Sequence, residues 1–316
     1  MRAFEYRLRP APTTAAGPIL PLLCGLILLA ASAFAVAPNS VASPLWLDAN
    51  GEPLPFASED EILDYLRSAR IVDRKRIDAG INRPYKMTLE RNGITAHAVF
   101  RTVDRVLNKS RKAKTPFEID RDSYKLEVAA YKFSRLVGLP RVPPVVLRRI
   151  RGQNGSLQLW VENAITEATL LTEQRDRDQT RTRLLQRQTM IAFDNLIYNF
   201  DRHLGNVLYD RAGRLWYIDH TRSFRGRAEL ATPDKIQLCD RRLLDRLRHL
   251  KDHEVFDVLR PFLNGWEMRT LIRRRDLLVE WCDRRIADHG ADLILFDFEA
   301  TLASRPEESE LRLSKG

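Results

Sequence analysis

Apolar and polar positions follow two different spacings along the chain. In residues 59–162, short segments alternate between apolar and polar side chains, as strands with one buried face do. In residues 163–302, apolar residues recur every three or four positions, as on one face of a helix. The pattern predicts an α+β protein with a small strand-rich part followed by a larger helical part.

The clearest strand signal is a hairpin. Two alternating segments, 85–91 and 94–101, flank Asn92-Gly93, a pair that tolerates the positive φ of a tight turn. Further strands are expected over 142–147 and 156–162.

Capping residues mark where helices begin and end. Ser58 to Glu61 fits a capping box, which predicts a helix starting at residue 59. Asp122 is placed to cap a second helix over 123–137, and Gly138 stops it. Glu127 lies at the edge of that helix's apolar stripe, where it is either solvated or directed inward to a cation. The later helices are expected over 174–198, 238–250, 254–263 and 266–289.

The densest polar cluster between apolar runs lies in residues 194–219. The pattern there predicts a helix, a loop, a strand over 207–209, a turn and a second strand over 215–218. The loop carries Asp201, Arg202, His203 and Asn206, and the second strand ends on Asp219.

This spacing of oxygen-bearing side chains suits phosphoryl transfer. The reaction needs a carboxylate that orients the attacking oxygen, and oxygen ligands for metal ions that neutralise the phosphates. Asp201 would be the base or orienting group. Asn206 and Asp219 would supply hard oxygen ligands for Mg²⁺ or Mn²⁺.

The same residues carry a resemblance to known enzymes. In protein kinases the catalytic Asp precedes its metal-binding Asn by five positions, in H-R-D-x-x-x-x-N. Here the His follows the Asp, as Asp201-Arg202-His203-x-x-Asn206, and an apolar strand pair leads to Ile218-Asp219-His220. This arrangement resembles the loops of phosphatidylinositol 3/4-kinase-like enzymes, and it is similar to atypical kinases of the secretory pathway and their bacterial relatives.

The resemblance implies a protein-kinase-like bilobal fold. Its N-lobe would be small and β-rich, would contain one helix, would span residues 59–162, and would roof a nucleotide with its strand pair. Its C-lobe would be larger and helical, would span residues 163–302, and would carry the catalytic and metal loops. The order of elements read from the periodicity agrees with this architecture.

The resemblance also implies roles for individual residues. Asp201 would be catalytic, with Arg202 and His203 shaping the loop or contacting phosphate, and Asn206 and Asp219 would bind the metal. Five further residues would form the nucleotide site: Lys86, Arg101, Glu127, Leu159 and Val161.

Within that nucleotide site the sequence departs from the family. Glu127 would match the helix glutamate whose partner is a strand lysine, but Arg101 stands where the lysine is expected. Arginine is larger and forked, so it is not a conservative replacement at a tight phosphate site. Lys86, on the preceding strand, is the alternative cation. No glycine-rich loop is present, so Asn92-Gly93 is the turn expected to approach the phosphates. Leu159 and Val161 would lie in the connection between lobes that contacts adenine.

The N-terminal residues 1–43 look like a targeting segment. Three arginines precede an almost wholly apolar run over 19–37, and small residues follow. A cleaved signal peptide and an uncleaved membrane anchor both fit. The distribution of positive charge places the following domain outside the cytoplasm, in the periplasm or secreted. Residues 44–58 are expected to be a linker and residues 303–316 a flexible tail.

Composition narrows the possible partners and the redox chemistry. The 316 residues carry a net charge of +10, mostly from arginines along helices. No zinc-finger spacing or RNA-recognition strand accompanies this charge, so no nucleic-acid partner is expected. Cys24 lies in the apolar run. Cys239 and Cys282 could form one disulfide or none, and two buried thiols are the favoured interpretation.

Three functions follow from these observations. The first is an ATP-dependent phosphotransferase that uses Mg²⁺ or Mn²⁺ and acts on a hydroxyl of a protein, glycan or lipid. The second is a pseudokinase, a module that binds nucleotide or a partner without transfer, as Arg101 suggests. The third, supported by net charge alone, is a basic protein that binds anionic surfaces.

Overall fold

The fold described here is that of a computed structural model, which describes residues 46–77, 82–107, 120–173 and 181–298. All of these belong to one compact unit, residues 43–316. Within the described ranges no helix is long and apolar enough to cross a membrane. The predicted targeting run over 19–37 and the predicted tail over 303–316 lie outside those ranges.

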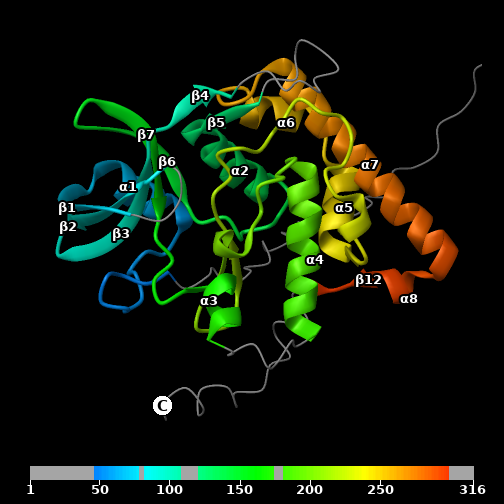
Figure 1. Ribbon diagram of the computed structural model, residues 1–316, viewed down its shortest axis with the longest axis horizontal. Coiled ribbons are helices and arrows are strands. Elements are labelled where there is room, and N and C mark those ends of the chain that lie inside the picture. The colour runs from blue at the N-terminus through cyan, green and yellow to red at the C-terminus, as the bar shows by residue number, and fades with distance from the viewer. Residues whose placement is uncertain (1–45, 78–81, 108–119, 174–180, 299–316) are drawn as a thin grey trace, which may run out of the picture. The chain divides into compact units, whose positions relative to one another are not determined.

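The N-lobe is built on a five-stranded antiparallel sheet in the order β1-β2-β3-β7-β6 (Figure 1). Its strands are β1 (Arg70–Arg76), β2 (Tyr85–Arg91), β3 (Ile94–Arg101), β6 (Val145–Ile150) and β7 (Gln153–Leu159). The predicted hairpin is confirmed as β2 and β3, joined by Asn92 and Gly93, both at positive φ. Strand β1 was not expected, because most of its side chains are charged and exposed and leave no apolar alternation.

Two helices cover the sheet. Helix α1 (Glu59–Ser68) begins as the capping pattern predicts, with the Ser58 side chain accepting from the Glu61 N–H. Helix α2 (Tyr124–Leu136) packs against β6 and β7 and ends before Gly138. Its N-cap is Ser123, not Asp122 as predicted. Asp122 is fully buried and has ion-pair partners elsewhere, which frees it from capping.

Two short segments extend the N-lobe. Strands β4 (Asp104–Val106) and β5 (Arg121–Ser123) pair where a loop was expected.

Part of the predicted linker is packed against the domain. Trp46 is buried against Trp216, with ring centroids 4.5 Å apart, and Leu54 is buried as well. The two bulky apolar side chains explain why residues 46–54 do not behave as a linker.

The C-lobe is helical around a small sheet, as predicted. The order β10-β9-β8 joins β8 (Ile165–Thr166), β9 (Val207–Tyr209) and β10 (Leu215–Tyr217). The helices are α3 (Glu167–Thr172), α4 (Arg181–Leu196), α5 (Arg241–His249), α6 (Asp252–Leu259), α7 (Gly265–His289) and α8 (Ala291–Ile294). Figure 1 shows α4, α5 and α7 gathered together, and α7 contacts both α4 and α5. A short parallel pair, β11 (Cys239–Asp240) and β12 (Leu295–Phe296), completes the described part.

Helix α7 is tied to β11 by a disulfide. Cys239 and Cys282 are bonded to each other, and both are buried. The favoured expectation of two free buried thiols was therefore wrong. Forty-three positions separate the two residues in sequence, so only the packing of α7 beside β11 could bring them together.

Candidate active site

A cavity of about 710 Å³ holds most of the side chains that the sequence singles out. It is lined by strand β3 and the end of β7 on one side, and by the loops around β9 and β10 on the other. Seven predicted site residues line it: Arg101, Leu159, Val161, Asp201, His203, Asn206 and Asp219. The other three, Lys86, Glu127 and Arg202, are not among its described lining residues.

The two predicted metal ligands come from the ends of one strand pair. Asn206 is buried immediately before β9, and Asp219 lies two residues after β10. Since β9 and β10 are antiparallel neighbours, with Val207 opposite Tyr217, the two ligands emerge on the same side. Asp219 has a φ of 62°, in the left-handed region that a non-glycine residue rarely adopts. Such strain persists only where the surroundings hold it.

Arg202 occupies the interior of this strand pair and not the cavity. Its guanidinium forms two hydrogen bonds with Asp194 of α4, both of 2.9 Å. Nη1 also donates to the carbonyl oxygens of Asn206 and Ile218, each at 2.7 Å. Burial disfavours the charge, but the adjacent carboxylate of Asp194 raises the pKa of Arg202. The residue therefore links the segments that carry the two candidate ligands.

Asp201 presents its carboxylate at the mouth of the cavity. Its side chain is 41% exposed, and Oδ2 accepts from Arg222 Nη1 at 3.2 Å. Arg222 is in turn anchored by the fully buried carboxylate of Asp122, at 3.3 Å. His203 also lines the cavity, and its Nδ1 accepts from the Gly205 N–H, which shapes the loop.

Glu127 is fully buried behind the cavity and accepts three hydrogen bonds. The backbone N–H of His220 donates to Oε2 at 2.8 Å, while Gln158 Nε2 and His220 Nδ1 each lie 3.0 Å from Oε1. Burial by itself would raise the pKa of Glu127, but the charge of Arg101 and the bonds from His220 lower it to about 2. Glu127 is therefore directed inward and not solvated, and its hydrogen-bond partners are Gln158 and His220.

No direct hydrogen bond joins Arg101 to Glu127 in the described structure. Arg101 Nη1 donates to Gln158 Oε1 at 3.2 Å, and the amide of Gln158 donates onward to Glu127. Lys86, the alternative cation, lies over the ring of Trp160 at 4.6 Å. Of the two candidate cations, Arg101 therefore lines the cavity and Lys86 is not among its described lining residues.

Four arginines and no lysine are among the described lining residues: Arg76, Arg83, Arg101 and Arg222. Two of them come from the ends of the β1–β2 connection, of which residues 78–81 lie outside the described ranges. The predicted phosphate turn, Asn92-Gly93, is not among the described lining residues, because it closes the opposite end of the β2–β3 hairpin. The connection between β1 and β2 reaches the cavity in its place.

The end of β7 and the connection after it belong to the same wall of the cavity as Arg101. Leu159 and Val161 line the cavity with Trp160 between them. The N–H groups of Leu159 and Trp160 are bonded to Pro144 O and His97 O, at 2.8 and 3.0 Å. These bonds hold an apolar surface of the type that a flat ring system requires.

The donor set of Asn206 and Asp219 fits a hard divalent cation. Mg²⁺ is usually held by one or two protein carboxylates together with substrate phosphates and waters. Asn206 Nδ2 lies 3.5 Å from Asp201 O, so its side-chain oxygen is the atom suited to coordination. The described part of the chain contains no group of three or more His, Cys, Asp or Glu side chains that could hold a metal ion.

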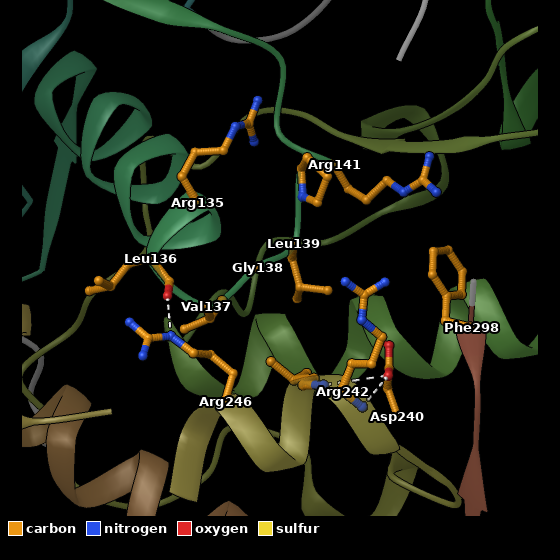
Figure 2. A pocket seen from close by; sticks show the side chains of 12 residues that line it. Arg135, Leu136, Val137, Gly138, Leu139, Arg141, Asp240, Arg242, Arg246 and Phe298 are labelled. Carbon is orange, nitrogen blue, oxygen red and sulfur yellow. Dashed lines mark hydrogen bonds between the residues drawn. The ribbon is translucent and has the colours of Figure 1, made fainter. Parts of the chain in front are cut away.

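A second cavity, of about 450 Å³, lies between the end of α2 and α5 (Figure 2). It is rich in arginine, but Arg135 is paired with Glu59, and Arg246 with Glu254 and Leu136 O. None of the predicted site residues lines it.

Four residues that line the first cavity or bond to residues of the candidate site were not predicted as site residues. Gln158 and Arg222 line the cavity, whereas Asp122 and His220 are buried and contact Arg222 and Glu127, respectively. Asp122 was read as a helix cap, and Gln158 as one position of an alternating strand. His220 is the last residue of the Ile218-Asp219-His220 triplet, in which the resemblance assigns no role to the histidine. An arginine three positions after a candidate metal ligand is a sequence signal that could have identified Arg222.

Comparison with known proteins gives the fold. No protein-family model matches the chain, and no curated protein matches its sequence. The structure of hydra Fam20 with sugar is similar, with a TM-score of 0.59 and 18% identity over 77% of this chain and 94% of that chain. The Golgi casein kinase is similar with a TM-score of 0.56 and 14% identity, over 75% of this chain and 77% of that one. Its structure with Mn/ADP bound gives 0.55 and 15%, over 75% and 78%. The chain therefore has an atypical protein-kinase-like fold, whereas the likeness to phosphatidylinositol kinases and to bacterial relatives stays a prediction.

Proposed function

We propose that the protein is an ATP-dependent phosphotransferase that acts on a hydroxyl group of a protein, glycan or lipid. The observation that carries the proposal is the meeting of Asp201, Asn206 and Asp219 on one cavity whose other wall carries Arg101, Leu159 and Val161. Asp201 would orient the acceptor and take its proton as the hydroxyl oxygen attacks the γ-phosphorus. The bond from that phosphorus to the bridging oxygen breaks, and ADP leaves.

Asn206 and Asp219 would hold Mg²⁺ or Mn²⁺ against the nucleotide phosphates. A divalent cation there supplies neutralisation of the developing phosphate charge. Arg101 would contact the phosphates, and Leu159 and Val161 would contact adenine. The similarity to a kinase structure containing Mn/ADP supports this choice of ligands.

The test is ATP turnover by the purified full-length chain with Mg²⁺ or Mn²⁺. Asp219→Ala is expected to reduce turnover at least a hundredfold, because it removes the only carboxylate assigned to the metal. The matched control is Asp234→Ala, a change in a short 3-10 helix that does not line the cavity. Unchanged turnover in Asp219→Ala would rule out the assignment.

A pseudokinase is the second candidate, because Arg101 engages Gln158 and not Glu127. It predicts stabilisation by ATP and metal without product formation. Arg101→Lys separates the phosphotransferase from the pseudokinase. Raised ATP turnover in the variant would mean that arginine at this position lowers activity, and a fall in turnover would mean that Arg101 itself contacts the phosphates during transfer.

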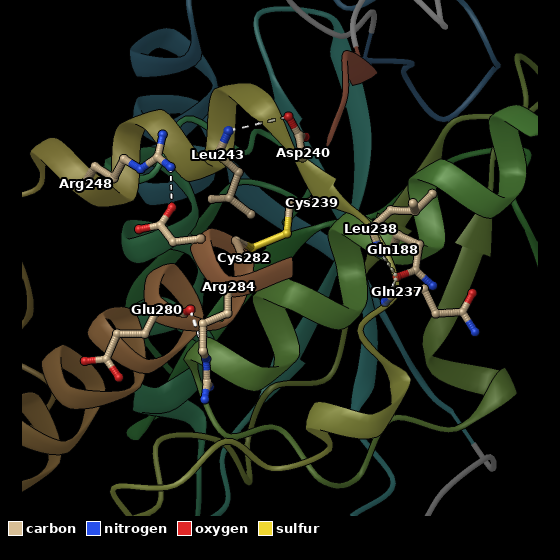
Figure 3. The surroundings of a disulfide bond; sticks show 11 residues. Gln188, Gln237, Leu238, Cys239, Asp240, Leu243, Arg248, Glu280, Cys282 and Arg284 are labelled. Carbon is tan, nitrogen blue, oxygen red and sulfur yellow. Dashed lines mark hydrogen bonds and ion pairs between the residues drawn. A yellow bond between two sulfur atoms is a disulfide. The ribbon is translucent and has the colours of Figure 1, made fainter. Parts of the chain in front are cut away.

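We further propose that the domain works outside the cytoplasm. The disulfide between Cys239 and Cys282 supports this, since such bonds persist in oxidising compartments (Figure 3). Residues 1–43 would provide export or membrane attachment. To test the location, protease is added to cells whose outer barrier is opened but whose cytoplasmic membrane is intact. Cleavage of the domain is expected, and protection of the domain would contradict an extracytoplasmic location.

A further inference from the structure

The peptide units on both sides of Asp219 are held by buried side chains. On one side, the carbonyl oxygen of Ile218 accepts from Arg202 Nη1 at 2.7 Å. On the other, the N–H of His220 donates to Glu127 Oε2 at 2.8 Å. Asp219 lies between these two bonds with its φ of 62°. A backbone conformation of this kind needs surroundings that impose it.

The side chain of His220 joins the two holding groups to each other. Its ring is fully buried, with Nε2 3.0 Å from Arg202 Nη2 and Nδ1 3.0 Å from Glu127 Oε1. An arginine nitrogen can only donate, so Nε2 accepts and the ring proton lies on Nδ1. Nδ1 therefore donates to Glu127. Both ring nitrogens have a hydrogen-bond partner of the right kind only in the tautomer that carries its proton on Nδ1.

We propose that Arg202, His220 and Glu127 are positioning residues that hold Asp219 in its left-handed conformation and so aim its carboxylate at the metal. The inference rests on the proposed function for the identity of the ligand, but the clamp itself is a property of this chain. It gives Glu127 a different task from the one that the family resemblance implies. Glu127 serves the metal-binding loop, and Gln158 supports Arg101 in its place.

The two ends of the clamp come from different lobes. Glu127 is carried by α2 of the N-lobe, whereas Arg202 is anchored to Asp194 of α4 in the C-lobe. Arg202 also binds the carbonyl oxygen of Asn206, so it sets the positions of both candidate ligands. A displacement of α2 would release the His220 N–H and with it the conformation of Asp219.

The test uses the full chain and Glu127→Gln, which keeps the shape of the side chain. An amide cannot accept all three hydrogen bonds, because its nitrogen presents donors to donors. Hydrogen exchange of the His220 amide is expected to be at least tenfold faster in the variant. The affinity for ADP with Mn²⁺ is expected to fall about tenfold by calorimetry, whereas the affinity for ADP without metal stays within twofold.

A structural role alone would give another pattern, which a control variant defines. Phe193→Leu changes a fully buried ring that packs edge-on against His220, with centroids 6.1 Å apart, and removes no hydrogen bond. It should lower the Tm without changing the ratio of the two ADP affinities. His220→Ala, a second test of the clamp, should change that ratio as Glu127→Gln does.

The outcomes separate the clamp from the proposed function. A loss of metal-free ADP affinity in Glu127→Gln, with the effect of Mn²⁺ intact, would overturn the clamp, because Glu127 would then act on the strand cation. Unchanged exchange of the His220 amide would also overturn it. If the unmodified chain bound no ADP under any condition, the nucleotide function would fail, and the exchange experiment would still decide whether Glu127 holds the loop.

Discussion

Breaking the bond between Cys239 and Cys282 should destabilise the protein strongly. The two cysteines lie 43 positions apart, so the disulfide closes a long loop of the unfolded chain. In the chain-entropy treatment, a disulfide that closes a loop of that length stabilises the folded state by about 4 kcal/mol at 25 °C. Strain in the folded state changes this value. For a domain of this size, that loss corresponds to a fall in Tm of about 10 °C.

The assay is thermal unfolding of the full chain with and without a thiol reductant, repeated for Cys239→Ala, Cys282→Ala and the double variant. Either single substitution breaks the bond, so the double variant should be hardly less stable than the singles. Only the unmodified chain should respond to the reductant. Additive effects of the two substitutions, or a reductant shift below about 2 °C, would refute the reasoning, because unbonded thiols contribute independently.

Three further predictions concern other parts of the structure. Burial raises the pKa of Asp240 from 3.8 to about 6, so between these pH values the folded state keeps a proton that the unfolded chain releases. The free energy of unfolding therefore falls as pH rises through that range. In denaturant titrations Asp240→Asn should make the free energy of unfolding less dependent on pH there, and an unchanged dependence would contradict the prediction. Arg222→Gln should lower kcat about tenfold or more with little change in the KM for ATP, since Arg222 holds Asp201; an effect confined to KM would place the guanidinium on the nucleotide instead. Trp46→Ala should cost about 3 kcal/mol of unfolding free energy, as for other large buried rings, whereas a true linker residue would cost nothing measurable.

Local patterns were sufficient for much of the fold. Strands β2 and β3 were predicted to the residue, because Asn92-Gly93 determines both the turn and the register. The strand pair β9 and β10 was expected within a residue, and α7 (Gly265–His289) within one residue of its predicted start. Strands β6 (Val145–Ile150) and β7 (Gln153–Leu159) were each displaced by three residues from the expected 142–147 and 156–162. The N-cap of α2 was misassigned because one residue had two possible roles. Asp122 is a good helix cap in isolation, but burial beside Arg222 uses its carboxylate instead.

The residues of the candidate site also fall into two groups, those that local sequence could predict and those that depend on contacts far apart in sequence. Asp201, Asn206 and Asp219 could be proposed from spacing, because they lie on one short loop and strand pair that the local sequence specifies, and the three residues line one cavity. Glu127 could be proposed but not understood, since its partners come from 31 and 93 positions away. Gln158 and His220 look ordinary in sequence. Only the approach of α2 to the end of β10 makes them part of one buried network.

The sequence by itself was sufficient to predict a candidate phosphoryl-transfer site, because carboxylates and an amide at fixed short spacings belong to the local chain. It also determined the two-part architecture, because hydrophobic periodicity is a local property. Tertiary structure alone decided how those groups are held. Contacts between segments far apart in sequence decide four features of the protein. These are the left-handed conformation of Asp219, the tautomer of His220, the presence of Arg101 at the cavity, and the Cys239–Cys282 disulfide. Such contacts form only when packing and hydrogen-bond satisfaction are met throughout the core at once.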